Sequence, residues 1–370
     1  MSIRGIKAVA KGLCAFFAIS TVISACDRRP LEVYYPEAAI VKLNVDWLSE
    51  FKQTPSGMTV LFAKDGDAIT QTTVTNSVNS TTVSLKPGTY KMLIFNQSKD
   101  EFGSIYFQNL TSYTDALALA RNVTTRTTQK WDEGVTYMCD PERLGYATDE
   151  IVITEEMLEE QAVFVNYEHR NDSRKTVDSV LYVYNEVVYP LTTTLYVRAR
   201  VRGIGNMLSV EGNIDGLANG CQLSQVWRTG ETGTLLLSGW KTTLNSDNQS
   251  EGWITITVNT FGLPRGKEYL ASRNAEDNVI TLNFTLKDGT TKLFRFNVGK
   301  FIHYINNGEP GSELHPADVV LALELILDAP ILDETDIIVL PDVEDKKIKG
   351  GGFDAEVAPW EDGGTIDIGL

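Results

Sequence analysis

The sequence has few of the side chains on which most enzymes depend. Only three histidines (His169, His303 and His315) and four cysteines occur among its 370 residues. No HExxH, GxSxG or EF-hand signature is present, and no GxGxxG follows an expected strand. No CxxC pair occurs either, which excludes a zinc ribbon and a thioredoxin-type site. We therefore expect no catalytic residue, no bound metal and no cofactor.

Positive charge is also scarce. Lysine and arginine total 33 against 49 aspartates and glutamates, so the formal net charge is -16. A chain this acidic would repel nucleic-acid phosphates and anionic lipid headgroups, so we expect no nucleic-acid partner. The composition is otherwise ordinary for a globular protein, with 42% apolar and 22% charged residues, which excludes wholesale disorder.

Long apolar runs are absent except at the start of the chain. Residues 1–25 carry Arg4, Lys7 and Lys11 and no acid, and an apolar stretch of small and large residues runs from Gly12 to Ala25. This pattern is typical of a cleaved signal peptide and is too short for a permanent membrane span. Its removal would change the formal net charge from -16 to -19.

The segment Ile23-Ser24-Ala25-Cys26 resembles the lipobox of bacterial lipoproteins. That resemblance implies that the Cys26 thiol is acylated with chains such as palmitate and becomes the new N-terminus, anchored in a membrane. Residues 26–36, polar and containing two prolines, would then be a tether between the lipid and the first domain. The alternative is an ordinary cleaved signal followed by an incidental cysteine.

Two cysteines remain for the folded part of the protein. Cys139 and Cys221 lie in the two different domains that we expect. Two lone cysteines are not a disulfide framework, so we expect both to be free and partly buried, with a disulfide between them as the alternative.

Short strand signals dominate the rest of the chain. Examples are the alternating Ala39–Val45, the core-like Thr89–Asn96, and Val279–Leu286 with Lys292–Val298 around a Lys287–Thr290 hairpin turn. We also expect Thr72–Leu85 to form a half-exposed strand pair turning near Asn76–Ser80. Many short strands with frequent turns predict an all-β protein built as two tandem β-sandwiches, at residues 37–165 and 166–342.

The expected helices are minor. Thr111 or Ser112 would cap a helix over Thr111–Val123. Glu155–Gln161 would form a second short helix or a turn, with its paired glutamates in solvent.

The C-terminal residues 343–370 form a separate segment. A charged stretch leads to Gly350-Gly351-Gly352, which we expect to act as a flexible hinge, and the last residues alternate apolar Ile366, Ile368 and Leu370 with polar ones. The segment would be a strand that docks elsewhere or, alternatively, a frayed acidic tail.

Other candidate sites have plainer explanations. Gly262–Glu268 lacks the spacing of a phosphate loop and predicts a turn. Asp65 and Asp67 have the oxygens that calcium prefers but are typical of an exposed loop. Trp227, Trp240 and Trp253 lie in one β-rich stretch, where we expect core packing, with an exposed sugar-stacking platform as the alternative.

Several stretches together resemble the fimbrial anchor and assembly lipoproteins of Bacteroidetes, which are fimbrillin-like. They are Lys86–Asn96, Val197–Asn206 followed by Val210–Gly216, Leu282–Val298 and Gly351–Leu370. The resemblance implies two transthyretin-like β-sandwiches held at the cell outer membrane, exposed at the surface, by the lipid on Cys26. It implies a non-enzymatic role in a pilus (fimbrium), with pilin-like subunits docked by β-strand addition.

One other function stays open at this point. A surface lipoprotein for glycan binding or host adhesion would use the tryptophans of the second domain. Exposed tryptophans in one patch would favour it, and buried ones would oppose it.

Overall fold

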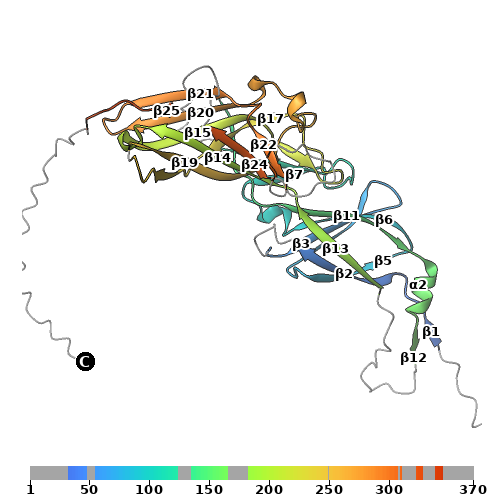
Figure 1. The fold of residues 1–370 in the computed structure, drawn as a ribbon. Coiled ribbons are helices and arrows are strands. Elements are labelled where there is room, and N and C mark those ends of the chain that lie inside the picture. Colours follow the sequence, from blue (N-terminus) through green and yellow to red (C-terminus); the bar gives the residue numbers. More distant parts are fainter. Residues whose placement is uncertain are drawn as a thin grey trace, which may run out of the picture.

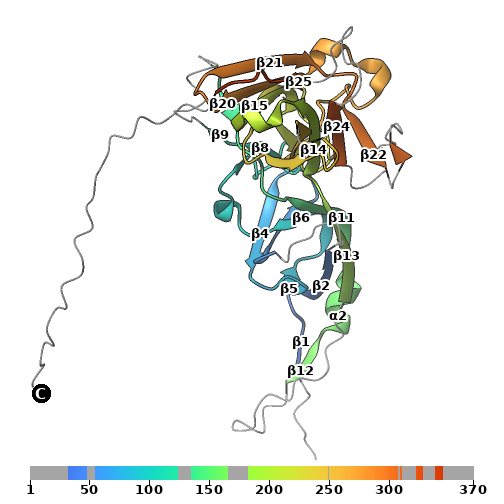
Figure 2. The same ribbon diagram turned by 60° about the vertical axis from the view of Figure 1, so that its left-hand side comes forward.

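The computed structural model describes residues 32–47, 55–123, 135–165, 182–248, 250–306, 309–310, 322–327 and 338–344. Strands make up 58% of these residues and helices 7%, so the predicted all-β class is confirmed. Figures 1 and 2 show an elongated molecule with two bodies of sheet, one above the other. The expected signal peptide, Cys26 and residues 345–370 lie outside the described residues.

The first sandwich contains seven strands in the order β4-β3-β6-β11-β13-β2-β5. Their bounds are β2 (Ala39–Trp47), β3 (Met58–Lys64), β4 (Ile69–Thr75), β5 (Ser80–Leu85), β6 (Gly88–Asn96), β11 (Gly145–Ile153) and β13 (Tyr182–Pro190). Alternate residues of β2 point inward, so that Val41 and Leu43 pack with Phe62 of β3 and Met92 of β6. The prediction that Thr89–Asn96 is a core strand is confirmed, because residues 92–96 of β6 are all buried.

The expected pairing within Thr72–Leu85 is wrong. β4 and β5 exist, but β4 pairs with β3 and β5 pairs with β2, at the two ends of the strand order. Each alternates between exposed and covered residues, as an edge strand does. The threonine-rich pattern predicts a half-exposed strand correctly, but it carries no information on which neighbour the strand joins.

The second sandwich has two sheets. The β15 sheet has the order β21-β20-β15-β17-β10-β9, and the β14 sheet has the order β18-β19-β14-β24-β22-β23, with β25 also paired to β14. The strands of the β15 sheet are β9 (Asn122–Val123), β10 (Tyr137–Met138), β15 (Met207–Ala218), β17 (Thr232–Leu237), β20 (Val279–Leu286) and β21 (Thr291–Asn297). Those of the β14 sheet are β14 (Thr193–Arg202), β18 (Lys241–Leu244), β19 (Glu251–Thr260), β22 (His303–Asn306), β23 (Glu309–Pro310), β24 (Ala322–Leu327) and β25 (Ile338–Val339).

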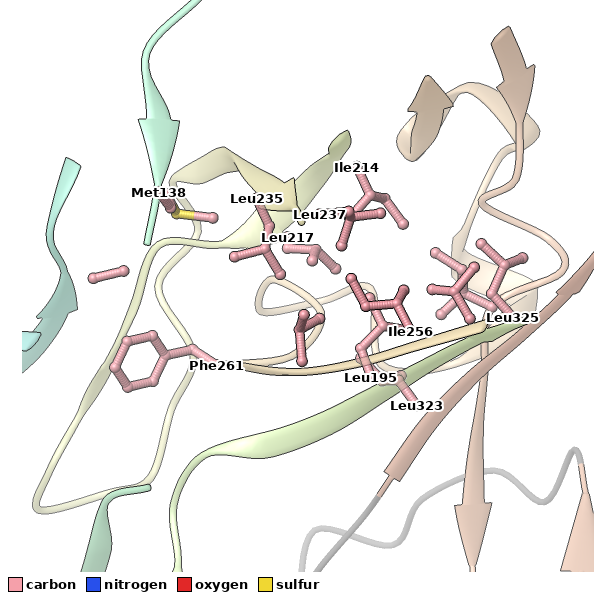
Figure 3. Packing of buried hydrophobic residues seen from close by; sticks show 14 of the residues in the cluster. Met138, Leu195, Ile214, Leu217, Leu235, Leu237, Ile256, Phe261, Leu323 and Leu325 are labelled. Atoms are coloured by element: carbon pink, nitrogen blue, oxygen red, sulfur yellow. The ribbon is translucent and has the colours of Figure 1, made fainter. Parts of the chain in front are cut away.

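Apolar side chains from the two sheets interlock between them (Figure 3). Leu195, Ile256, Leu323 and Leu325 of the β14 sheet lie below Ile214, Leu217, Leu235 and Leu237 of the β15 sheet. The predicted hairpin turn at Lys287–Thr290 is confirmed. It joins β20 to β21, and Gly289 supplies the left-handed conformation there, with φ of 83°.

A separate, small sheet joins β16 (Gly220–Gln222), β8 (Leu117–Ala120) and β7 (Ile105–Gln108). The expected helix over Thr111–Val123 is therefore wrong. The hydroxyls of Ser112 and Thr114 donate hydrogen bonds to the Asp67 carboxylate instead of capping a helix. A short run of leucine and alanine fits either a buried helix or a buried strand, and here the flanking strands β7 and β16 decide.

The second predicted helix is confirmed as α2 (Glu155–Glu160), the single α-helix of the described residues. Thr154 caps it by accepting a hydrogen bond from the Met157 amide. Its four glutamates are exposed, as expected. Short 3-10 turns complete the structure at η2 (Lys99–Glu101), η4 (Ile204–Asn206), η5 (Leu270–Ser272) and η6 (Ala275–Asp277).

Strand pairing connects the two halves of the chain. β10 runs parallel to β17 of the second half, and β13 runs parallel to β2 of the first. One apolar cluster extends from Phe95 and Phe102 to Leu325. The two sandwiches thus share buried surface, and the division of the chain after residue 165 stays a prediction.

Candidate docking surfaces

The described chain begins at one end of the long axis. β1 (Glu32–Tyr34) pairs antiparallel with β12 (Val163–Val165), and both lie at the end of the molecule remote from the second sandwich (Figures 1 and 2). Cys26, six residues before β1, falls outside the described residues, as does the tether up to residue 31. Its role as the lipid attachment site stays a prediction.

A seam opens in the first sandwich between β11 and β13. These strands pair only at Gly145–Pro190 and Tyr146–Tyr189. Beyond that point β11 continues on β6 alone, and β13 continues on β2 alone. Among the described strands, none pairs with the second edge of residues 147–153 of β11 or of residues 182–188 of β13. Such an edge carries the backbone donors and acceptors that an added strand needs.

Side chains close this seam in place of backbone hydrogen bonds. The Tyr184 hydroxyl donates to the Val152 carbonyl oxygen at 3.5 Å. Glu186 points into the covered side, where its Oε1 has no hydrogen-bond partner. Burial, followed by the charge and hydrogen bond of Asp149, raises the pKa of Glu186 to about 7. When Glu186 is protonated, its carboxyl group can form a hydrogen bond with the carboxylate of Asp149. Two ionised carboxylates could not form this hydrogen bond.

Helix α2 fastens the two strands next to the seam. The Gln161 side chain accepts from the Ile40 amide at 2.7 Å and donates to the Ile40 carbonyl at 2.8 Å. Gln161 therefore bonds the backbone of Ile40 as a paired strand would. The pairing of β2 with β13 begins at the next residue, where Val41 pairs with Tyr182. Tyr182 in turn donates to the Glu160 carboxylate, which raises the pKa of Tyr182 to about 12. Residues 160–161 thus act as a clasp on β2 and β13.

The outermost strands β4 and β5 offer two further edges. The start of β4 is already occupied, because the Ile69 amide donates to Thr111 and Ala68 forms a bridge to Ser112. Asp67 holds this contact: its carboxylate accepts from Ser112 and Thr114, which lowers its pKa. The acidic loop that had the oxygens for calcium is therefore used to fix one segment against another.

The tryptophans fit neither expectation fully. Trp227 is 46% exposed, so core packing is wrong for it, and the Arg265 guanidinium lies 3.7 Å from its ring centroid. Trp240 is partly buried against the core and donates to the Leu237 carbonyl. Trp253 is partly covered by Arg198 at 3.6 Å. No ring contact among the described residues brings these three into one platform.

The two cysteines are free thiols, as predicted. Cys139 is half-buried and Cys221 is buried, and burial raises the pKa of both. Arg228 approaches the Cys221 sulfur at 3.4 Å and donates to the carbonyls of Leu191 and Val226. A protonated thiol tied into such a network is a poor nucleophile.

The remaining candidates are structural. Gly262–Glu268 is the predicted turn, and Lys267 pairs with Asp277 at 2.9 Å. His303 contacts Glu324 at 3.2 Å, and His169 and His315 lie outside the described residues. Within the described ranges, no three acidic, histidine or cysteine side chains gather as a metal site. In those same ranges, no helix has the length and apolar character needed to cross a bilayer.

Comparison with solved structures identifies relatives in fold. A candidate adhesin from Bacteroides ovatus superposes with a TM-score of 0.52 at 16% identity, over 84% of this chain and 94% of that one. The fimbrial anchor protein Mfa2 from Porphyromonas gingivalis has a TM-score of 0.41 at 12% identity, over 77% and 95%. A fimbrial assembly protein from Parabacteroides distasonis has 0.30 at 11%, over 74% and 90%.

The first of these comparisons confirms the resemblance in fold to a Bacteroides adhesin. A sequence model of the family described as "Domain of unknown function (DUF5119)" matches residues 25–238. No curated protein matches the chain.

Proposed function

The chain belongs to the DUF5119 family, and we propose that it is a non-enzymatic outer-membrane lipoprotein that serves as a fimbrial anchor or assembly subunit. The observation that carries this proposal is the position of β1. Its start, six residues after Cys26, lies at the end of the long axis opposite the second sandwich (Figure 1). A lipid on Cys26 would hold this end at the membrane and present the second sandwich farthest from it.

Docking of pilin-like subunits would use β-strand addition at the seam between β11 and β13. Two strand edges face it, and among the described residues only side chains close it. An added strand would gain backbone hydrogen bonds from either edge, while its alternate side chains would meet Ile151, Ile153 and Val188 of the core. The clasp at residues 160–161 would keep β2 and β13 aligned while the seam opens.

Fractionation of cells tests the anchoring part of the proposal. We expect the wild-type protein to remain with outer membranes and the Cys26→Ser variant to appear in the soluble fraction. Cys139→Ser is the matched control, because it also removes a thiol but leaves the lipobox intact. A Cys26→Ser variant that stays membrane-bound through its own chain would contradict lipid anchoring.

Crosslinking of intact cells tests the fimbrial part. The protein is purified from the outer membrane after crosslinking, and mass spectrometry identifies what is attached to it. Pilin-like β-subunits joined to residues of β11 or β13 are the expected products. Recovery of glycan-uptake components alone would contradict the anchor role.

The exposed Trp227 favours a second candidate, a surface glycan-binding or adhesion lipoprotein. Its ring, backed by Arg265, presents an aromatic surface of the kind on which sugars stack. A glycan array tests this: Trp227→Ala would abolish binding, whereas Trp240→Ala, which alters a packed ring, would not. No binding by the wild-type protein would remove this candidate.

A further inference from the structure

Three arginines form a row on the outer face of the β14 sheet. Arg198, Arg200 and Arg202 alternate along β14 with Val197, Ala199 and Val201, which are buried in the core. The period of two in a strand places the arginines together on the side away from that core. We call them the arginine row. It is unusual in a chain whose formal net charge is -16.

Glu251 of β19 is the described carboxylate that pairs with the row. Glu251 accepts from Arg200 at 2.7 Å and from Arg202 at 3.0 Å, which lowers the pKa of Glu251. Arg198 stacks on Trp253 and has no carboxylate partner within the described ranges. Lys241 of β18 adds a further cation to this face. It pairs with Thr255 of β19, and Thr255 pairs in turn with Arg198.

Apolar side chains border the row on its other side. Ile326 of β24 pairs with Arg198 and is 37% exposed, and Val339 of β25 pairs with Arg202 and is 49% exposed. The face therefore combines four cations, and the carboxylates of Glu251 and Glu324, with two exposed aliphatic residues and the accessible part of Trp253. An acidic segment with interspersed apolar residues would match it in both respects.

We propose that this face is covered by the chain's own residues 353–362, Phe-Asp-Ala-Glu-Val-Ala-Pro-Trp-Glu-Asp. From residue 353 to residue 370 the chain has five acids and no base. Asp354, Glu356, Glu361 and Asp362 would face the arginine row and Lys241, while Phe353, Val357 and Trp360 would cover Ile326 and Val339.

The place where the described chain ends supports this occupant. The Leu340 amide donates to the Arg202 carbonyl, and the Asn206 side chain donates to Asp342 at 3.0 Å. Residue 344 thus follows directly from the Arg202 end of the row. Nine residues from there to Phe353 reach about 30 Å when extended, and Arg202 to Arg198 spans only about 13 Å. The three consecutive glycines at 350–352 permit the chain to turn back.

This inference goes beyond the proposed anchor role and does not depend on it. A tethered segment acts at an effective concentration near the millimolar range, so even weak contacts keep the face covered. An acidic extended segment of a partner would have to displace residues 353–362 before it could use the arginine row.

A photo-crosslinker at Thr257 tests the proposal in the full chain purified in detergent. Thr257 is exposed and shares the face with the arginine row, through its pairing with Tyr196. We expect crosslinks within one monomer from residue 257 to the peptide containing Phe353–Asp362. The same crosslinker at the exposed Lys292 of β21, in the other sheet, is the matched control and should give at least fivefold less of this product.

The charge requirement is tested first on residues 353–362, where substitutions leave every described residue unchanged, and then on the arginine row itself. Replacing Asp354, Glu356, Glu361 and Asp362 by their amides, or raising the salt to 1 M, should lower the crosslink at least fivefold. Arg198→Glu with Arg200→Glu should do the same, and lysines at the four tail positions should then restore it. Equal crosslinking from Thr257 and Lys292, products only between two copies, or no effect of charge would each overturn the proposal.

Discussion

Glu186 on β13 lies opposite Asp149 on β11, at the place where these two strands separate. The register of the two pairs that remain, Gly145–Pro190 and Tyr146–Tyr189, extends to Asp149 and Glu186. Burial raises the pKa of Glu186 to about 7, and the nearby charge of Asp149 adds to the effect. The environment of the seam thus favours the protonated form of the Glu186 carboxyl group over the ionised form.

The first prediction concerns pH. The folded pKa of Glu186 lies above its ordinary value of 4.5, so the folded protein binds more protons than the unfolded chain between these values. Stability should therefore fall as pH rises from about 4.5 to about 7 and then level off. Glu186→Gln should remove this decline, raising the free energy of unfolding at pH 8 by about 1–3 kcal/mol and leaving it little changed at pH 4.

Denaturant unfolding of both proteins at pH 4, 6 and 8 provides the measurement. Glu150→Gln is the control, since Glu150 is an exposed neighbour on β11, and it should leave the decline in place. Parallel stability curves for wild type and Glu186→Gln would contradict the assignment of this pH dependence to Glu186.

The second prediction concerns the clasp. Gln161→Ala removes both hydrogen bonds to Ile40 and leaves two backbone groups of β2 without partners. We expect a loss of about 1–3 kcal/mol in unfolding free energy, together with faster amide hydrogen exchange at Ile40 and Val41. Gln108→Ala on β7, where the glutamine is exposed, should change neither quantity. Unchanged exchange at Ile40 would show that Gln161 does not secure β2.

Local patterns were sufficient to predict individual strands, but not their partners. The alternation of Ala39–Val45 and the turn at Lys287–Thr290 predict β2 and the β20–β21 hairpin, because both depend on nearest neighbours. The parallel pairing of β2 with β13 joins residues more than 130 positions apart. No local signal specifies such a contact. The error at Thr111–Val123 has the same origin, since β7 and β16 make that segment a strand.

The seam between β11 and β13 also could not be predicted from the sequence. In Tyr182–Val188 the alternation of polar and apolar residues is weak, and Glu186 resembles a solvated side chain. Its burial follows only from the divergence of β13 from β11. The arginine row, by contrast, was present in the sequence as Arg198, Arg200 and Arg202, and regular alternation with valine and alanine was the signal that could have revealed it.

The third prediction concerns the join between the two sandwiches. Arg228 donates to the carbonyl of Leu191, just before β14, and to that of Val226. Arg228→Met keeps the length of the side chain but leaves those carbonyls unsatisfied, so we expect a loss of about 2–4 kcal/mol. Arg265→Met alters a guanidinium that stacks on exposed Trp227, and it should cost less than about 1 kcal/mol. Equal losses in thermal and denaturant unfolding would show that Arg228 has no special role.

The fourth prediction separates the seam from the other edges as the place of strand addition. In the free protein, amides at residues 147–153 that point away from β6 have no partner among the described strands and should exchange rapidly. A subunit that adds a strand to the seam would slow their exchange, and that of residues 182–188, by at least tenfold. Amides of β3, which lies between β4 and β6, provide the internal control and should not change.

The same exchange experiment identifies the alternatives. Protection confined to β4 or β5 on addition of the partner would place docking at an outer edge and contradict the seam. Glu186→Gln gives a sharper comparison, because it stabilises the closed seam at neutral pH without removing a strand edge. If the seam must open before a strand enters, this variant should bind the partner more slowly at pH 8, whereas Glu150→Gln should bind at the wild-type rate. Equal association rates would mean that docking does not pass through the seam.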